Sequence, residues 1–344
     1  MALAEKQVYL YVGPHKSGTF YLRDQIFPYV QGVYDVRTRD NYVIDRLLDA
    51  AAENPLFLDI GKLRAELDDR LGKVSESKIV ISNPDFFGAY EQMATPSLFS
   101  TKQFWDNAHK ANLLARLFPR AKIILTPRRQ DTWIESYYRG VLKSAQTVRL
   151  DEFVSPALDV RQANTSLAER PACDLSTLDW SVYVANYRQQ FGEENVLVIP
   201  NEMLLRETPD ALSRLYGFMD TPPYQPDKFR RVNRGYSARA CRIARALNRY
   251  VHGPRNPLGF IPNRPFFNAI MARRSRSMFW RLLAGISRRL SLNWFLTNVV
   301  DGYFRGPDEL FSDEERARIM EHFHAPNRAY AELIGEDLSR YGYY

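Results

Sequence analysis

The residues whose types and spacing could do chemistry are concentrated in Gly13–Thr19, which reads Gly-Pro-His-Lys-Ser-Gly-Thr. This segment directly follows Val8–Val12, an apolar run with the composition of a short buried strand. A strand that enters a glycine-bracketed turn and then a helix forms an anion site, because backbone N–H groups and the positive end of the helix dipole converge there. We therefore predict that Gly13–Thr19 holds an anionic group.

The loop resembles the P-loop of kinases and ATPases, but its lysine lies elsewhere. The Walker pattern needs a Lys directly after its second glycine. Here Thr19 follows Gly18, and Lys16 precedes that glycine by two residues. The cation would meet the bound group from inside the loop rather than from the first helical turn. Taken alone, the segment could also be a purely structural turn.

A second polar group follows the apolar run Lys122–Thr126. The run ends in Pro127-Arg128-Arg129, and Ser136 comes eight residues after Arg128 on the next helical pattern. A guanidinium at a strand end and a hydroxyl two turns up the following helix can converge on one phosphate. The alternative is a solvated arginine pair and an ordinary helical serine.

The elements that must position these residues alternate between strand and helix. Buried strands are predicted at Val8–Val12, Lys78–Ser82, Lys122–Thr126 and Asn195–Ile199. Helices are predicted at Thr19–Tyr29, Lys102–Phe118, Gln130–Lys143 and Leu178–Phe191, the last ending at Gly192. This order predicts an α/β fold, a three-layer P-loop-like core with a mostly parallel sheet and helices on both faces. Ligands of such sheets bind at the carboxyl ends of the strands, where both polar groups fall.

The remainder of the chain predicts a helical cap. Arg230–Tyr250 and Ser275–Leu290 look helical and basic, and Ser312–Ile334 predicts a final helix that Ser312 and Glu315 begin as a capping box. We expect a single domain with a core at 1–225, a basic, aromatic-rich cap or insertion at 226–304, and a C-terminal helix at 305–344 that packs back on the core.

Charge is spread unevenly along the sequence. Lys228–Val300 contains fifteen Arg, one Lys and no Asp or Glu, a charge of +16, so a total of +7 leaves 7 − 16 = −9 for the rest. An asymmetry of this size predicts an anionic partner for the C-terminal third.

Composition predicts a folded chain in a reducing compartment. Apolar residues make up 45% of the 344 residues, and no apolar run is long enough to span a membrane. The N-terminus enters the first strand without room for a signal peptide, and the two cysteines give no disulfide framework. The five histidines lack metal-ligand spacing, so we expect a cytoplasmic protein without a metal site.

Together the two polar groups resemble the sulfotransferase family that uses 3′-phosphoadenosine 5′-phosphosulfate (PAPS). Pro14-His-Lys-Ser-Gly-Thr19 is similar to the family loop that holds the 5′-phosphosulfate, and Arg128 with Ser136 is similar to its 3′-phosphate element. Phe191–Glu202 resembles the last core strand and the helix start after it. The tail Asp337–Tyr343 resembles the ends of bacterial members. The resemblance covers roughly residues 5–220 and 305–344 and only part of Lys228–Val300.

This resemblance implies a donor site and a reaction. The reaction would move a sulfuryl group from PAPS to a hydroxyl or amine by in-line displacement, with Lys16 at the bridging oxygen and no metal. The nucleotide site would comprise Gly13, Pro14, His15, Lys16, Ser17, Gly18, Thr19, Phe20, Tyr21, Arg128, Ser136, Arg234 and Gly235. For Tyr21, a place in the core is as good an interpretation as a place beside adenine.

Hydroxyl attack also needs a proton acceptor, and three residues are candidates. Asp40 follows Arg39 where carbohydrate-type members place a catalytic Glu after a Lys, so it ranks first. His15 adjoins the loop and ranks second. Asp85 follows the predicted strand Lys78–Ser82 and ranks third, although loop capping would explain either aspartate.

The acceptor is expected to be a hydroxylated carbohydrate, lipid or small molecule. The cap interleaves arginines with Trp, Phe, Met and Leu, which is typical either of a helical lid or of a patch that contacts an anionic membrane from the cytoplasmic side. Such a patch would suit a lipid or glycolipid acceptor. A polyanionic acceptor also fits, whereas no nucleic-acid motif accompanies the charge. The oligomeric state is left open.

Two other functions compete with sulfuryl transfer. A P-loop nucleotide kinase would share the strand, loop and helix, but the sequence lacks its Gly-Lys-Ser/Thr. A non-catalytic, nucleotide-dependent membrane-binding module would use the same loop and cap without turnover.

Overall fold

The computed structural model describes residues 2–88, 107–154, 173, 175–224, 226, 235–252, 256, 258–261 and 291–344. Within these residues the chain forms one five-stranded sheet in which every strand is parallel to its neighbours. The strands are β1 (Gln7–Tyr11), β2 (Val33–Asp35), β3 (Lys78–Ser82), β4 (Lys122–Leu125) and β5 (Val196–Val198), in the spatial order β2-β3-β1-β4-β5. The predicted α/β class is confirmed.

Four strands agree with the sequence to within a residue at each end, and β2 was missed. Its three residues are too few to show a strand pattern, and it pairs only with β3, where Val33 faces Lys78. At the centre, Tyr11 of β1 lies opposite Ser82 of β3 and Ile124 of β4. The loop after β1 therefore leaves the middle of the sheet at its carboxyl edge.

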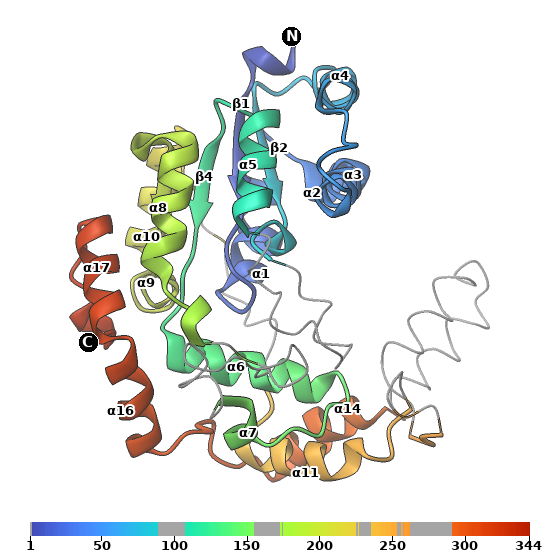
Figure 1. Ribbon diagram of the computed structural model, residues 1–344, viewed down its shortest axis with the longest axis vertical. Coiled ribbons are helices and arrows are strands. Elements are labelled where there is room, and N and C mark those ends of the chain that lie inside the picture. Colours follow the sequence, from blue (N-terminus) through green and yellow to red (C-terminus); the bar gives the residue numbers. More distant parts are fainter. Residues whose placement is uncertain are drawn as a thin grey trace.

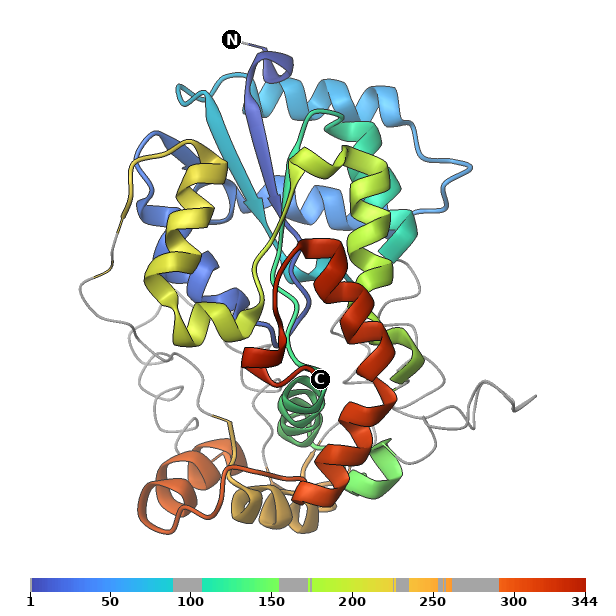
Figure 2. The same ribbon diagram turned by 90° about the vertical axis from the view of Figure 1, so that its left-hand side faces the viewer.

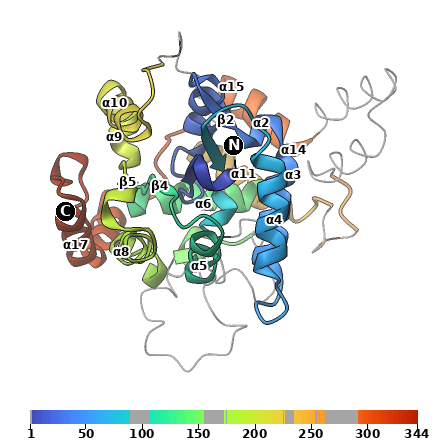
Figure 3. The same cartoon turned by 90° about the horizontal axis from the view of Figure 1, so that it is seen from above.

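Helices cover both faces of the sheet (Figures 1 and 3). Tyr9 of β1 points to one face, where its hydroxyl donates to the Met219 carbonyl at 2.8 Å and its ring packs edge-on against Phe218. Val8 points to the other face, where it lines a pocket together with Phe118. Alternate side chains of one strand thus serve two helical layers, as a three-layer architecture requires.

The helices before the cap are α1 (Thr19–Tyr21), α2 (Val36–Arg39), α3 (Asn41–Ala52), α4 (Ile60–Leu71), α5 (Asn107–Leu117), α6 (Gln130–Lys143), α7 (Leu150–Val154), α8 (Trp180–Phe191), α9 (Asn201–Arg206) and α10 (Thr208–Met219). The predicted helices at Gln130–Lys143 and Leu178–Phe191 correspond to α6 and α8, and Gly192 ends α8 with a φ of 89°. Thr19–Tyr29 is helical but changes from α1 to a π-turn and then a 3₁₀ turn.

The cap contributes α11 (Ala238–Asn248), α14 (Leu292–Phe295) and α15 (Asp301–Tyr303), which lie beyond α6 at the carboxyl end of the sheet (Figures 1 and 2). The π-turn Leu296–Val300 joins α14 to α15. The predicted helix Ser275–Leu290 lies outside the described residues, as do parts of Arg230–Tyr250 and Lys102–Phe118.

The predicted single helix Ser312–Ile334 is wrong. Two helices, α16 (Asp313–His322) and α17 (His324–Ile334), meet at Phe323. Pro326 explains the break, because in a continuous helix its ring would clash with the carbonyl of residue 322. The capping box at Ser312 and Glu315 is confirmed.

The C-terminal residues pack against the core (Figure 2). Arg316 of α16 forms an ion pair with the fully buried Asp131 of α6. The Tyr343 hydroxyl donates to the Glu202 carboxylate of α9 at 2.8 Å. Residues near the end of the sequence thereby fix the starts of two helices that border the loop after β1.

Candidate active site

The loop between β1 and α1 approaches neighbouring elements closely at two glycines, Gly13 and Gly18. A Cβ on Gly13 would lie 2.6 Å from Thr126 Oγ1, so only glycine lets the loop approach the end of β4 this closely. Gly18 has a left-handed backbone with φ 76°, and a Cβ there would lie 2.3 Å from Asn201 Nδ2. Close contacts with the end of β4 and the start of α9 therefore require glycine at both positions.

Three successive carbonyls of the loop accept hydrogen bonds from one segment of the chain. Trp133 Nε1 donates to the His15 carbonyl at 2.7 Å, Arg128 Nη1 to the Lys16 carbonyl at 2.9 Å, and Thr126 Oγ1 to the Ser17 carbonyl at 3.0 Å. All three donors belong to the end of β4 or the start of α6. This pattern fixes the direction of each peptide plane, with its carbonyl toward β4 and α6.

Donors remain on the other side of these peptides. Among the described residues, the backbone N–H groups of Ser17, Gly18 and Thr19 have no hydrogen-bond acceptor. The hydroxyl of Ser17 is fully buried and also has no partner there. A buried donor set without acceptors is costly unless a ligand supplies them, so the loop fits a phosphate or sulfate group.

Lys16 is strained and lies among other cations. Its φ of 67° is left-handed, which costs a non-glycine residue about 1 kcal/mol. Burial, together with the charges of Lys143, Arg128 and Arg139, lowers the pKa of Lys16 to about 8. Four cations thus converge near the loop, and an anion placed among them would relieve their repulsion.

Arg128 precedes α6 by two residues, and its side chain reaches the face of α6 that carries Thr132 and Ser136. Arg128 Nε donates to Thr132 Oγ1 at 3.0 Å, and Ser136 follows Thr132 by one turn. Burial lowers the pKa of Arg128, and the charge of Arg139 adds to that effect. The side-chain hydroxyl of the half-buried Ser136 has no hydrogen bond among the described residues. Arg128 therefore lies beside the loop, and Ser136 lies one turn beyond Thr132, the residue that Arg128 contacts on α6.

The segment before α11 approaches the same helix. Arg139 Nε donates to the Tyr236 carbonyl at 2.9 Å, and a Cβ on Gly235 would lie 2.7 Å from Arg139 Cδ. The ammonium of Lys143 lies 4.8 Å from the Tyr236 ring centroid. Gly235, which the sequence predicts as a site residue, therefore lies against α6. Arg234 lies outside the described residues.

The remaining loop residues divide between core and surface. Pro14 and Thr19 are buried. Tyr21 is 8% exposed. Burial raises the pKa of Tyr21, and the nearby Tyr224 adds to this effect, so Tyr21 is a core aromatic residue. Phe20 is 44% exposed, with the guanidinium of Arg23 at 4.5 Å from its ring centroid. Of the two rings, Phe20 is the one available to a flat ligand.

His15 and Asp85 form a pair. His15 Nε2 lies 2.9 Å from Asp85 Oδ1 and 3.0 Å from the Gly88 carbonyl. Both neighbours are acceptors, so Nε2 carries hydrogen and Nδ1 is the basic nitrogen of the neutral ring. Burial lowers the pKa of His15, although the Asp85 carboxylate raises it in part. A neutral, oriented imidazole next to Lys16 can accept a proton near neutral pH.

Asp40 lies elsewhere. Arg70 Nε of α4 donates to Asp40 Oδ2 at 2.6 Å, and the neighbouring Arg39 pairs with Glu76, which lies just before β3. The loop leaves the carboxyl edge of the sheet, so the length of β3 separates it from Glu76. The structure does not bring the first-ranked candidate base to the loop, because α2 turns the chain back along β3.

Sequence reasoning missed the residues that support the loop. Trp133 looks like one more core residue of an amphipathic helix, and Asn201 like an ordinary helix start. Their contacts with His15 and Gly18 join segments more than a hundred residues apart in sequence. No local pattern could have indicated them.

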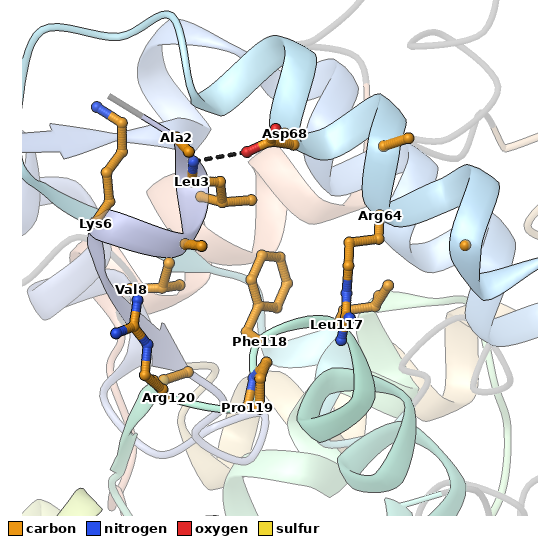
Figure 4. Close-up of a pocket in the computed structure, with 14 residues that line it drawn as sticks. Ala2, Leu3, Lys6, Val8, Arg64, Asp68, Leu117, Phe118, Pro119 and Arg120 are labelled. Carbon is orange, nitrogen blue, oxygen red and sulfur yellow. Dashed lines mark hydrogen bonds between the residues drawn. The ribbon is translucent and has the colours of Figure 1, made fainter.

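A partly open pocket of about 460 Å³ lies at the opposite end of the sheet, where the strands begin (Figure 4). Its lining is mainly apolar, and Arg64 and Arg120 lie among the lining residues with Asp68, which accepts a hydrogen bond from the Leu3 amide at 2.7 Å. Ligands of parallel sheets bind at the carboxyl ends of the strands, so this pocket is separate from the candidate site.

The described part of the chain contains no helix that is long and apolar enough to cross a membrane. It also contains no group of three or more His, Cys, Asp or Glu residues that could hold a metal ion.

Comparisons with known proteins give a weak similarity in structure. The chain is similar to the crystal structure of a sulfotransferase from Alicyclobacillus acidocaldarius, with 17% sequence identity and a TM-score of 0.39, over 66% of this chain and 87% of that one. No protein-family model and no curated protein matches the chain.

We predict that Gly18→Ala destabilises the protein by about 2 kcal/mol or more, because alanine adds a left-handed penalty of about 1 kcal/mol and a clash with Asn201. Asn201→Ala in the same chain should remove the clash but not the penalty. Thermal and urea unfolding of the single and double variants measure both terms.

The matched control is Gly217→Ala in α10, where an added Cβ meets nothing within 4 Å and which should be neutral or slightly stabilising. Equal unfolding midpoints for Gly18→Ala and Gly217→Ala would contradict the claim that position 18 requires glycine.

Proposed function

We propose that the protein is a PAPS-dependent sulfotransferase that transfers a sulfuryl group to a hydroxyl or amine. The observation that carries the proposal is the acceptor-less donor set of the loop, with the buried Ser17 hydroxyl at its centre and four cations around it. A P-loop kinase would need a lysine in the first helical turn, where this chain has Thr19.

The residues fit a nucleotide with phosphate groups at two positions. Ser17, Thr19 and the loop amides would hold the 5′-phosphate, since their donors face away from β4 and α6. Arg128 and Ser136 would hold the 3′-phosphate, with Gly235 beside them against Arg139. When bound, PAPS would supply the activated sulfuryl group, which leaves behind 3′-phosphoadenosine 5′-phosphate (PAP).

Lys16 would stabilise negative charge in the reaction, and His15 would accept the proton. The Lys16 ammonium would neutralise negative charge on the departing phosphate oxygen. His15 Nδ1 would take the proton of the acceptor hydroxyl, while Asp85 holds Nε2–H and so fixes the ring. This arrangement favours His15 as base, Asp85 as its positioning residue, and neither role for Asp40.

We predict that PAP binds without added metal and that Arg128→Ala weakens binding by about thirtyfold or more, since a buried phosphate partner is lost. Arg120→Ala, at the far end of the sheet, is the matched control and should leave affinity unchanged. Calorimetric titration with PAP and with ATP plus magnesium measures both.

The same titration separates the competing functions. Preference for ATP with magnesium would favour the kinase. PAP binding without turnover on any hydroxylated sugar or lipid would favour a non-catalytic module.

We predict that PAP affinity falls as the pH rises above about 8, because the Lys16 ammonium then loses its proton in the free protein. Binding near this pH should take up a proton, which appears as a dependence of the calorimetric enthalpy on the buffer. Lys16→Arg keeps its charge at all these pH values and should flatten the pH dependence. An identical profile for Lys16→Arg would assign the titration to another group.

We predict that His15→Asn lowers kcat by about a hundredfold or more, whereas Asp40→Asn leaves it within tenfold. Rates are measured as PAP release with the best acceptor from a panel of hydroxylated sugars and glycolipids. In the unsubstituted protein, kcat should fall as the pH drops through the pKa of His15. Asp85→Asn removes a group that raises this pKa, so it should move the acid limb to lower pH and reduce the plateau.

If all three variants keep kcat within tenfold, the base is another residue. An acid limb that does not move in Asp85→Asn would contradict the positioning role.

A further inference from the structure

The described part of the cap presents large aromatic side chains to solvent. Along the helical run Leu292–Tyr303, the residues Leu296, Val300 and Asp301 are buried, as is the N-cap residue Ser291. The other side of this run exposes Trp294 by 36%, Phe295 by 41% and Tyr303 by 80%, and Phe304 follows at 62%. Such a concentration of exposed aromatic rings is typical of an interaction surface.

Exposed arginines lie on the neighbouring helix α11. In α11, Ala240, Cys241 and Ala244 face inward, whereas Arg239, Arg242 and the C-cap residue Arg249 are exposed. Arg239 Nη1 donates to the Phe304 carbonyl at 2.8 Å, so the start of α11 adjoins the end of the aromatic run. We call this set the aromatic–arginine face; it comprises Arg239, Arg242, Arg249, Trp294, Phe295, Tyr303 and Phe304.

Most of this face belongs to a stretch of sequence with a one-sided charge. Lys228–Val300 contains sixteen basic residues and no acidic ones, and Arg239, Arg242, Arg245 and Arg249 are the four of them that the structure describes. Helices α11 and α14 lie beyond α6, at the end of the molecule toward which the carboxyl ends of the strands point (Figures 1 and 2). A partner with a dense negative surface and an apolar layer beneath it would match both the arginines and the rings.

We propose that the aromatic–arginine face docks on the surface of a membrane rich in anionic phospholipid. Arginines interact with phosphate headgroups, and Trp, Tyr and Phe side chains enter the boundary between headgroups and acyl chains. A soluble polyanion would engage the arginines alone and leave the exposed rings in water, so the membrane accounts for more of the surface.

The face is connected to the candidate active site through Tyr236. Its hydroxyl donates to Asn293 Oδ1 of α14 at 2.7 Å, its carbonyl accepts from Arg139, and its ring packs against Lys143. A docked membrane would thus lie next to the helix that borders the loop. If the proposed function holds, this placement favours a hydroxylated membrane lipid as acceptor.

The test is co-sedimentation of the full chain with vesicles of phosphatidylcholine alone or with phosphatidylglycerol, at low and at high salt. We expect binding to the anionic vesicles at low salt, weak binding to phosphatidylcholine, and a loss at high salt. Trp294→Ala/Phe295→Ala should weaken binding about tenfold, and Arg242→Gln/Arg249→Gln about fivefold for each arginine removed.

Matched controls remove similar groups elsewhere. Leu56→Ser/Phe57→Ser deletes two side chains that are 88% and 79% exposed in the connection between α3 and α4. Lys62→Gln/Arg120→Gln removes two exposed cations away from the cap. Both should bind vesicles like the unsubstituted protein, and circular dichroism with thermal melting confirms that each variant is folded.

Three results would overturn the proposal: no co-sedimentation at low salt, an equal loss in the controls, or a loss in the arginine variant with none in the aromatic one. The last would indicate a soluble polyanion, such as heparin or RNA, as the partner. Because PAP titration needs no membrane, failure of docking and failure of the proposed function are separate results.

Discussion

The candidate site depends on one interaction, the attachment of three successive loop carbonyls to the end of β4 and the start of α6. Trp133, Arg128 and Thr126 each donate to one carbonyl of His15–Ser17. Because the carbonyls are fixed on that side, the amides that follow and the Ser17 hydroxyl are left for a ligand. A loop held by so many donors does not have to be ordered by the ligand, which lowers the entropic cost of binding.

The same attachment explains why cations can gather at Lys16. Arg128 contacts the loop backbone directly, and the face of α6 that carries it continues to Arg139 and Lys143. Repulsion among these groups, and the left-handed backbone of Lys16, raise the free energy of the ligand-free state. The fold offsets part of this cost nearby, where Glu135 pairs with both Arg139 and Arg316, and Asp131 pairs with Arg316.

The candidate base shows where sequence reasoning succeeds and fails. His15 and Asp85 were both candidates, ranked apart, and the structure joins them in one pair. Asp40 was ranked first by its position after Arg39, yet α2 turns the chain so that it meets Arg70. Ranking Asp40 first by its spacing assumed that the chain continues toward the carboxyl edge of the sheet. The three-residue strand β2 and the four-residue helix α2 that redirect the chain are too short to be recognised in the sequence.

The sequence by itself determined the parallel α/β core, because buried strands and amphipathic helices have local patterns that each segment carries alone. It also located the loop and the Arg128–Ser136 group, since strand ends in a parallel sheet share one edge. Only the tertiary structure decided which residues hold the loop, which acid accompanies His15, and which aromatic rings of the cap remain exposed. These are contacts between distant segments, such as Gly18 with Asn201 and Arg239 with Phe304, and the packing that creates them leaves no periodic trace in the chain.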